Sequence, residues 1–419
     1  QAAFDRAAHR HNSGMVFSIV VSSVPRAGCL WTRCLQKPAP KDIACTAQLC
    51  KYFFFPRLAR PAFGIIAGTI CLASSGSRRA STSSSCESVS TVAANPRMKL
   101  LMEELERIAA KTSGRVGFSA KNVTNETLHV EINGGSRFPM ASTYKIPLAL
   151  VVLGLVDKGE IKLSHRVTLD AAKWARPGTG VVTAQLLKFG RAEFAILELL
   201  ELALNDSDNT GSDYLFELVG GPSVVDTKMR SLGLDMMNVS RTCAEHLADR
   251  CGVCRSANRL TNMVEFTATL EGRMECQPLV SLRDADKAFD ADDRDTTSPL
   301  DMTQLLCMVW KREVGLSEQS TQLLLDIMAK CRTGRGRIPG RLPSHMLNGN
   351  VMHKTGSLGG RSNDVGFLAL PNGQTIALSC YVMGGPGPGQ TQTQEMYAER
   401  EAVIADLARA CYDFFLFHV

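Results

Sequence analysis

Four short strand-like segments lie in two pairs at opposite ends of the chain, and this separation constrains the fold more than any other feature. The first pair covers residues 116–120 and 128–132 and is followed by the turn Asn133-Gly134-Gly135. The second pair covers residues 366–370 and 375–382 and is joined by Pro371-Asn372-Gly373. We therefore expect an antiparallel sheet whose strands are interrupted in sequence by a long block of other structure.

Helical patterns flank these strands and fill the space between them. From Met98 onward, leucine and isoleucine residues recur at spacings of three and four up to Ile108, which predicts an amphipathic opening helix. A closing helix is expected over about residues 394–415. The order of elements indicates an α+β fold in which an antiparallel sheet is flanked by N- and C-terminal helices, with an all-helical subdomain between its strands.

Residues 1–97 differ in character from the rest, so we divide the chain into a leader, 1–97, and a folded domain, 98–419. Within the leader, a basic flank and a short apolar run at about residues 57–75 are followed by serine-rich sequence. This order is typical of a signal peptide, and a secreted or periplasmic location follows if the segment acts as one. A disordered leader with one apolar segment is the alternative interpretation.

Composition excludes several classes of function. The chain is 45% hydrophobic and 21% charged and has a net charge of +6, with Lys and Arg scattered along it rather than gathered on one face. We therefore expect no nucleic-acid partner. No apolar run reaches the length of a membrane span, so we expect no stable span. We also expect a monomer.

The 14 cysteines are spread thinly over a chain with ample apolar residues for a core, and they decide nothing about its compartment. Cys251 and Cys254 have the two-residue spacing of a zinc knuckle or a redox pair. No second paired motif accompanies them, so incidental loop thiols or one disulfide are the preferred interpretation. We expect neither a metal nor a cofactor.

Ser142 precedes Lys145 by three residues, at the start of an apolar stretch that predicts a buried helix. Positions three apart on a helix share a face, so the lysine amine can reach the serine hydroxyl. Burial lowers the pKa of a lysine and lets it accept a proton from a nucleophile. Taken alone, the pair also fits a capping serine beside a surface lysine.

Two further motifs support the catalytic interpretation. Ser207-Asp208-Asn209 follows an amphipathic run at residues 194–204, and the segment from His353 to Ser357 precedes the second strand pair. The three motifs have the order and approximate spacing of those in class A β-lactamases and penicillin-binding proteins, which the chain from about Met98 to its end resembles. Further segments that resemble family landmarks are Gly220-Gly221-Pro222, residues 230–233, residues 295–301 and residues 363–366.

The resemblance implies a β-lactamase or transpeptidase-like fold and a role for each motif. Ser142 would be the acylated nucleophile and Lys145 its proton acceptor, while Ser207 would pass a proton to the departing lactam nitrogen. Backbone N–H groups of Ser142 and Ser357 would form the oxyanion hole. The remaining implied substrate-binding residues are Asn209, for the substrate's side-chain amide, and Lys354, Thr355, Gly356 and Ser357, for its carboxylate and its reacting carbonyl.

The resemblance fails at the residues that hydrolyse the acyl-enzyme. In the family, a loop Glu activates water and an Asn four residues later helps to hold it. Counting from Arg241, these positions carry Cys243 and Leu247, so Glu245 is the nearest substitute for the base. A solvated loop carboxylate is the alternative role for Glu245.

The loop that carries these residues is longer than usual for the family. Its closing residue is expected to be Asp295, paired with Arg241, and we place an insertion at about residues 248–288. The acidic and basic run at residues 283–294 is typical of a solvated, mobile loop.

The sequence therefore predicts a serine hydrolase that opens β-lactam amides, or related small cyclic amides and esters, through an acyl-enzyme on Ser142. Two alternatives remain open because the loop Glu is missing. One is a D,D-peptidase-like or esterase-like hydrolase that uses the same serine. The other is a penicillin-binding sensor that is acylated and does not turn over, since nothing activates the second water.

Overall fold

The computed structural model describes residues 96–176, 180–250, 288–384 and 393–419. The proposed leader and its signal-like segment lie outside the described residues, as do Cys251, Cys254 and most of the expected insertion. The first described helix begins at Pro96, within two residues of the expected domain start. No helix among the described residues is long and apolar enough to cross a membrane.

A five-stranded antiparallel sheet forms the centre of the fold, in the order β2-β1-β9-β8-β7. The two strands near the start pair directly with the strands near the end, since Arg115 lies opposite Met383 and Asn122 opposite Ile376. This confirms the interrupted antiparallel sheet. The strand bounds are β1 Arg115–Asn122, β2 His129–Ile132, β7 Val351–Leu358, β8 Arg361–Ala369 and β9 Thr375–Met383.

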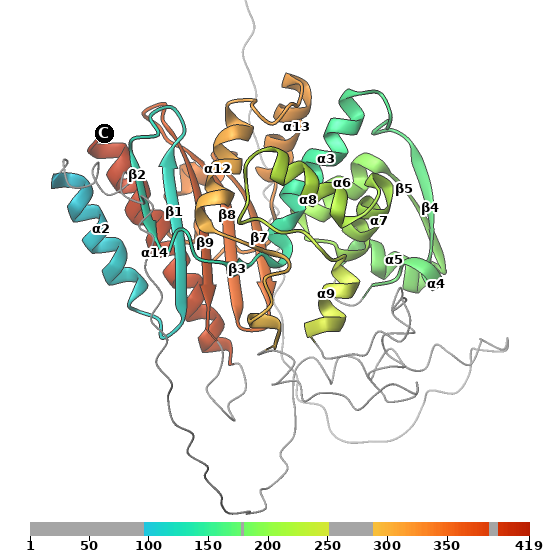
Figure 1. Cartoon of the computed structure of the whole chain (residues 1–419), viewed down its shortest axis with the longest axis horizontal. Helices are drawn as coiled ribbons and strands as arrows, with labels where there is room; N and C mark the ends of the chain where they lie inside the picture. The colour runs from blue at the N-terminus through green and yellow to red at the C-terminus, as the bar shows by residue number, and fades with distance from the viewer. Residues whose placement is uncertain (1–95, 177–179, 251–287, 385–392) are drawn as a thin grey trace, which may run out of the picture. The chain divides into compact units, whose positions relative to one another are not determined.

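The N- and C-terminal helices pack together on one face of the sheet (Figure 1). Helix α2 (Pro96–Ala109) buries Leu101, Leu105 and Ile108, as the three- and four-residue spacing predicts, together with Met98, whereas Leu100 is exposed. Helix α14 (Gln394–Phe417) covers the same face, and alternate residues of β9 such as Leu378 and Val382 point toward it. Terminal helices thus flank the sheet as expected.

The opposite face of the sheet packs against helix α12 (Pro299–Trp310) and joins a second, larger core. This core continues into the helical subdomain beside β7 (Figure 1). The main helices of that subdomain are α3 Lys145–Asp157, α5 Val181–Phe189, α6 Ile196–Asn205, α7 Asn209–Val219, α8 Pro222–Ser231, α9 Cys243–Arg250 and α13 Glu318–Met328, with the short α4 at Ala171–Trp174.

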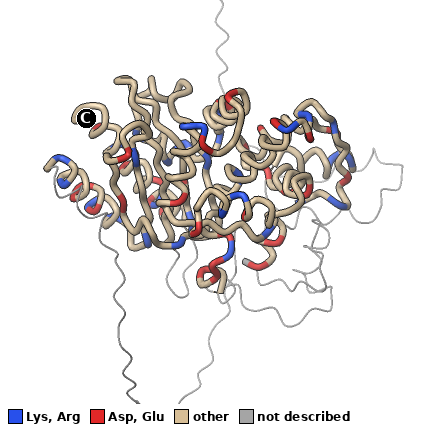
Figure 2. Tube along the Cα trace, turned by 45° about the horizontal axis from the view of Figure 1, so that its top comes forward, with Lys and Arg blue, Asp and Glu red and all other residues tan. Residues whose placement is uncertain are grey.

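Two small ribbons complete the scaffold. Strand β3 (Phe138–Pro139) pairs with β6 (Thr296–Thr297) and so ties the segment before Ser142 to the end of the long loop. Strand β4 (Arg166–Asp170) pairs with β5 (Arg191–Ala195) at the edge of the helical subdomain. Figure 2 shows basic and acidic residues interspersed along the described chain.

Strand β7 is the element that the sequence interpretation missed. The segment His353–Ser357 was placed ahead of a strand pair, but it forms the edge strand of the sheet itself. The reason is burial on both faces: Val351 through Gly356 are all buried, so the strand shows no alternation of apolar and polar residues. The polar side chains of His353, Lys354 and Thr355 are buried in the strand, whereas Ser357 is exposed.

Candidate active site

Ser142 lies in a short 3-10 turn (Ala141–Tyr144) that leads directly into helix α3. The turn is held tightly. Ala141 adopts a left-handed conformation with φ 45°, which is costly for a residue with a side chain. On the strand side, a Cβ added at Gly356 would lie 2.6 Å from the carbonyl oxygen of Met140, so only glycine allows β7 to approach this closely.

Asn363 on β8 also holds the backbone just before this turn in place. Its side-chain amide donates to the carbonyl oxygens of Pro139 and Met140, at 2.9 and 3.0 Å. Asn363 is completely buried, so these hydrogen bonds do not compete with water. The segment that carries Ser142 is therefore anchored to two strands of the sheet, which restricts where its hydroxyl can lie.

Lys145 begins helix α3, whose residues from Lys145 to Leu153 are all buried, as the apolar stretch predicts. Its amine donates to the carbonyl oxygen of Ser207 at 2.8 Å and to Asn209 Oδ1 at 3.1 Å, and it lies 3.4 Å from Ser207 Oγ. The lysine side chain is thus buried and hydrogen-bonded, and it does not extend along the surface into solvent.

Ser207 lies between helices α6 and α7 in a left-handed conformation with φ 61°. Asp208 caps α7 through a 2.8 Å bond from the amide of Gly211 and also accepts from the amide of Val182. These bonds fix the turn that presents Ser207 to two lysines. Its Oγ also accepts a 3.0 Å hydrogen bond from Lys354 Nζ.

Lys145 and Lys354 are 1% and 0% exposed, so two amines share a nearly dry site. Burial lowers the pKa of Lys145 from its ordinary value. Burial, reinforced by the charge of Lys145, lowers the pKa of Lys354 to about 7. Two ammonium groups in this buried site are therefore disfavoured, and one of the two amines can be neutral near physiological pH and accept a proton.

Thr355 and Ser357 continue β7 past Lys354. The Thr355 hydroxyl lies 2.6 Å from that of Thr333, on the segment after helix α13. Arg337 on the same segment donates to Ser357 Oγ at 2.6 Å and to the carbonyl oxygens of Gly356 and Asn363. The structure thus brings a further cation, Arg337, to the end of β7, which the sequence interpretation did not identify.

His353 and Cys331 form a second polar cluster next to Lys354. The ring nitrogen Nδ1 of His353 lies 2.9 Å from Asp364 Oδ1, and both side chains are buried. Burial disfavours the imidazolium, but the Asp364 carboxylate outweighs it and raises the pKa of His353 to about 10. Interaction with Cys331 raises the pKa of His353 further. The sequence patterns indicate no separate role for His353 or Cys331.

Cys243 lies beside Lys145, at the first position of helix α9. The buried carboxylate of Asp213 on α7 holds it there, because it accepts hydrogen bonds from the amides of Cys243 and Ala244 at 2.6 and 3.1 Å. Arg176 balances the same carboxylate through a 2.8 Å ion pair. Burial and the charge of Asp213 raise the pKa of the Cys243 thiol to about 12, so it is neutral at physiological pH.

Glu245 and Leu247 lie further along α9. One carboxylate oxygen of Glu245 accepts bonds from the amide and hydroxyl of Thr242, at 2.9 and 3.1 Å, in the manner of a helix cap. Leu247 is partly buried and packs against Ala141 and Phe289. The position at which the family carries a water-holding amide is therefore apolar here.

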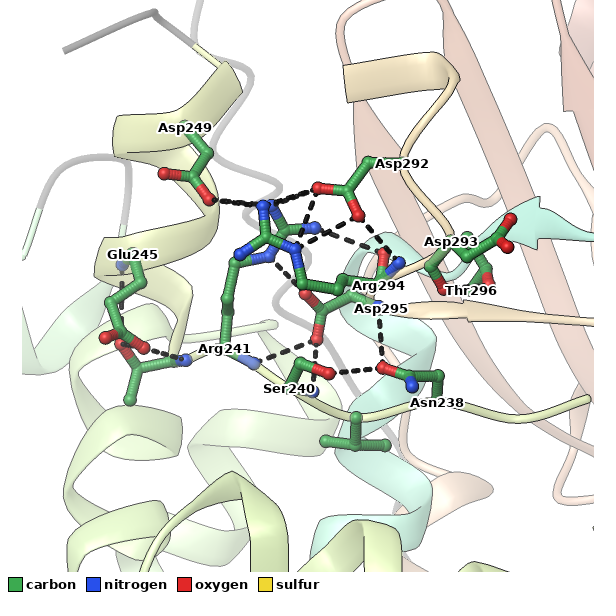
Figure 3. Close-up of polar contacts among 12 residues, drawn as sticks. Asn238, Ser240, Arg241, Glu245, Asp249, Asp292, Asp293, Arg294, Asp295 and Thr296 are labelled. Atoms are coloured by element: carbon green, nitrogen blue, oxygen red, sulfur yellow. Dashed lines mark hydrogen bonds and ion pairs between the residues drawn. The ribbon is translucent and has the colours of Figure 1, made fainter. Parts of the chain in front are cut away.

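Arg241 and Asp295 pair at the neck of the long loop, which confirms the expected bridge. Figure 3 shows the Arg241 guanidinium surrounded by carboxylates from both arms of the loop: Asp249 on α9 at 2.8 Å, Asp292 at 3.2 Å and Asp295. Asp295 also accepts a bond from the amide of Ser240 at 2.8 Å. The last residues of the charged run thus take part in an ion-pair network, with Arg294 at its exposed edge.

In the described parts of the chain, no group of three or more His, Cys, Asp or Glu side chains is placed to hold a metal ion. The polar groups that converge near Ser142 are amines, hydroxyls and amides. Such a set suits transfer of an acyl group to a hydroxyl and recognition of an anionic substrate.

Comparison with known proteins matches this chemistry. The chain is 27% identical to the extended-spectrum beta-lactamase PER-1 of Pseudomonas aeruginosa over 321 residues, which cover 75% of this chain and 87% of that enzyme. It is 26% identical to the beta-lactamase VEB-1 of the same organism, over 78% of this chain and 93% of that one.

Solved structures give the same result. A beta-lactamase from Chitinophaga pinensis has a TM-score of 0.58 and 27% identity and covers 75% of this chain and 98% of its own. TLA-1 extended-spectrum beta-lactamase has a TM-score of 0.58 and 25% identity and covers 76% and 99%. The sequence model of the Beta-lactamase enzyme family matches residues 100–415. The chain therefore belongs to the beta-lactamase enzyme family and is a serine hydrolase of the class A β-lactamase type.

Proposed function

We propose that this chain opens β-lactam amides through a covalent acyl-enzyme on Ser142, and that release of the acyl group is the slow step. The observation that carries the first part is the convergence of two buried lysines on Ser207 Oγ, next to the turn that bears Ser142. No structural need is evident for two amines in a nearly dry interior, since burying like charges is costly. A proton-transfer site explains them.

In the proposed acylation, Lys145 removes the proton from Ser142 Oγ, which attacks the lactam carbonyl carbon. The proton then passes by way of Ser207 to the lactam nitrogen as the C–N bond breaks. Lys354 and Thr355 bind the substrate carboxylate, and Asn209 binds its side-chain amide. Gly356 allows β7 to approach the Ser142 turn, and the amide of Ser357 joins that of Ser142 in the oxyanion hole.

The second part of the proposal concerns Cys243. A neutral thiol near Lys145 cannot replace the carboxylate that acts as general base toward water in the family. The side chain of Leu247 has no group that could hydrogen-bond that water. Glu245 is the nearest carboxylate along the chain. To act as the base, it would have to exchange its bonds to Thr242 for one to a water molecule.

The same observation favours the second candidate function, a penicillin-binding sensor that is acylated and remains so. The two candidates share Ser142, Lys145 and the residues proposed to bind the substrate carboxylate. They differ only in whether the acyl-enzyme ester on Ser142 is hydrolysed. A D,D-peptidase-like or esterase-like hydrolase is the third candidate, and it would deacylate only with its own substrates.

Time-resolved intact mass after addition of benzylpenicillin tests the proposal, together with nitrocefin hydrolysis. A penicillin adduct that forms quickly and disappears slowly, with sustained turnover, supports a slow β-lactamase. A stable adduct with a single stoichiometric burst supports the sensor. Absence of any penicillin adduct on Ser142 would refute the β-lactamase and the sensor. Activity on peptide or ester substrates alone would then select the third candidate.

A further inference from the structure

Phe289, near the end of the long loop, packs against the candidate site. It is 4% exposed and forms a buried apolar cluster with Ala141 and Leu358, against which Leu247 also packs. We call these four residues the Phe289 cluster. Ala141 directly precedes Ser142, and Leu358 directly follows Ser357 on β7. The cluster therefore contains residues from both segments whose amides are proposed to form the oxyanion hole.

Two arginines hold the ring of Phe289 in place. The guanidinium carbons of Arg241 and Arg361 lie 5.2 and 5.3 Å from the ring centroid, which is the range of a cation–π contact. The side chains of these arginines are 2% and 3% exposed, so the contacts are shielded from water and stronger than at a surface. The ring of His246 lies 4.8 Å away, centroid to centroid. Moving Phe289 therefore means giving up several buried contacts.

Asp290 fastens the same part of the loop to the turn between β7 and β8. Its Oδ1 accepts a 2.9 Å hydrogen bond from Arg361 Nε and a second bond from Nη2 of the same guanidinium. Arg361 pairs with Leu358 in the ladder of the two strands, and its Nη1 donates to the Leu358 carbonyl oxygen at 3.4 Å. One guanidinium thus joins the loop to the residue of β7 that belongs to the Phe289 cluster.

The direction of β7 indicates which part of a substrate meets this cluster. Lys354 and Thr355, proposed to bind the carboxylate, come first, Ser357 at the proposed oxyanion hole follows, and Leu358 lies beyond it. A strand advances about 3.3 Å per residue, so Leu358 lies roughly 13 Å past Lys354. In a β-lactam, the carbon that bears the acyl side chain is bonded to the lactam carbonyl on the side away from the nitrogen and the carboxylate. The Phe289 cluster therefore lies at the acyl side-chain end of the site.

We propose that the Phe289 cluster is a specificity-determining wall, which selects β-lactams whose acyl side chain is compact and unbranched. This inference rests on the function proposed above and names its substrate class. A branched side chain enters only if Phe289 leaves its contacts with Arg241 and Arg361 and the bonds of Asp290 open. A compact side chain leaves these contacts in place. The wall thus discriminates between acyl side chains and not between ring systems.

Two cephalosporins test the wall with the full chain. Cephalothin and cefotaxime share the ring system and the acetoxymethyl substituent, but the acyl side chain is unbranched in cephalothin and a branched oxyimino group in cefotaxime. Intact mass at low substrate concentration gives the acylation rate constant for each. Cephalothin should acylate the wild type at least about tenfold faster, because cefotaxime has to displace a ring held by two cation–π contacts. Phe289→Ala should raise the rate constant for cefotaxime about tenfold and leave that for cephalothin within about twofold.

A second variant decides the question if Phe289→Ala folds poorly. The side chain of Asp290 is 40% exposed, so Asp290→Asn should fold as the wild type does and should raise the ratio of cefotaxime to cephalothin acylation about two- to fivefold. Asp293→Asn is the matched control, because it removes an exposed carboxylate from the same run and should leave the ratio unchanged. Thermal unfolding of each variant reports whether the fold is intact.

The possible failures of the wall and of the proposed function are distinguishable. Equal acylation of the wild type by both cephalosporins, or an unchanged ratio in both Phe289→Ala and Asp290→Asn, would overturn the wall and leave the proposed function intact. An equal rise in Asp293→Asn and Asp290→Asn would also overturn it, because the effect would then be one of charge alone. Absence of an adduct on Ser142 with either cephalosporin and with benzylpenicillin would refute the proposed function, and the wall with it.

Discussion

Arg241 and Asp295 form an ion pair at the neck of the long loop, and both side chains are almost completely buried. The pair joins Arg241, two residues before helix α9, to Asp295, the residue just before strand β6. It thereby fixes the start of α9, where Cys243 lies beside Lys145, relative to the segment that leads to Ser142. The position of Cys243 in the candidate site thus depends on an ion pair between Arg241 and Asp295.

Arg241→Ala is therefore expected to lower the free energy of unfolding by about 3–5 kcal/mol, because removing one partner leaves a buried carboxylate unpaired. Urea denaturation measures the change. Arg294→Ala is the matched control, since Arg294 joins the same network from the exposed side and its loss should cost less than about 1 kcal/mol. Equal losses in the two variants would show that the buried pair has no special role.

Ser142→Ala and Lys145→Ala should each abolish covalent labelling by penicillin while the protein stays folded. A coupled nucleophile and base act as one unit, so losing either usually costs several orders of magnitude in rate. Intact mass reports the adduct and circular dichroism reports the fold. Normal labelling of Ser142→Ala would refute the assignment of the nucleophile.

Deacylation should respond to position 243. The wild type is expected to accumulate the acyl-enzyme, and Cys243→Glu should shorten its lifetime by a factor on the order of 100 or more, since a placed general base contributes about that much. Stopped-flow acylation followed by intact mass separates the two steps. An unchanged lifetime in Cys243→Glu would mean that position 243 does not face the attacking water.

Glu245→Gln tests the remaining carboxylate. If Glu245 releases Thr242 and activates water, the substitution should leave acylation intact and stabilise the adduct. If its role is to cap helix α9, neither chemical step should change. Rapid turnover in both the wild type and Glu245→Gln would point to a different base, such as Lys145, Glu265 or Glu271.

Acylation by an anionic β-lactam should weaken as pH rises from 6 to 8. The pKa of Lys354 is lowered to about 7, so its positive charge is present below this pH and lost above it. The acylation rate constant at low substrate concentration should therefore fall across pH 7. A substrate whose carboxylate is esterified should lack this fall, and so should Lys354→Arg, because arginine stays protonated. Identical profiles for the acid and its ester would contradict carboxylate recognition by Lys354.

Local sequence patterns predicted the terminal helices, the buried helix after Ser142 and both strand pairs. Each of these elements has a recognisable pattern of apolar residues that face the core. The pairing of Arg241 with Asp295 followed from the family resemblance. Strand β7 escaped the pattern analysis because both of its faces are buried. The motif residues on it were recognised by their identity and not by any strand signal.

Arg337 and Cys331 were missed for a different reason. Their segment is irregular, and nothing local indicates that it packs against β7. Likewise, the count from Arg241 placed Cys243 at the position of the missing base, but only the structure shows the Asp213 carboxylate that holds it beside Lys145. Contacts between residues far apart in sequence require the tertiary structure.

The pairing of β1 with β9 also has a consequence for biosynthesis. Arg115 pairs with Met383, so strand β1 finds this partner only after β9 has left the ribosome. Until then the early hairpin of β1 and β2 has an open edge. A premature stop codon before β9 would therefore leave every residue of the candidate site present in the sequence and the site itself unassembled, with an aggregation-prone product in its place.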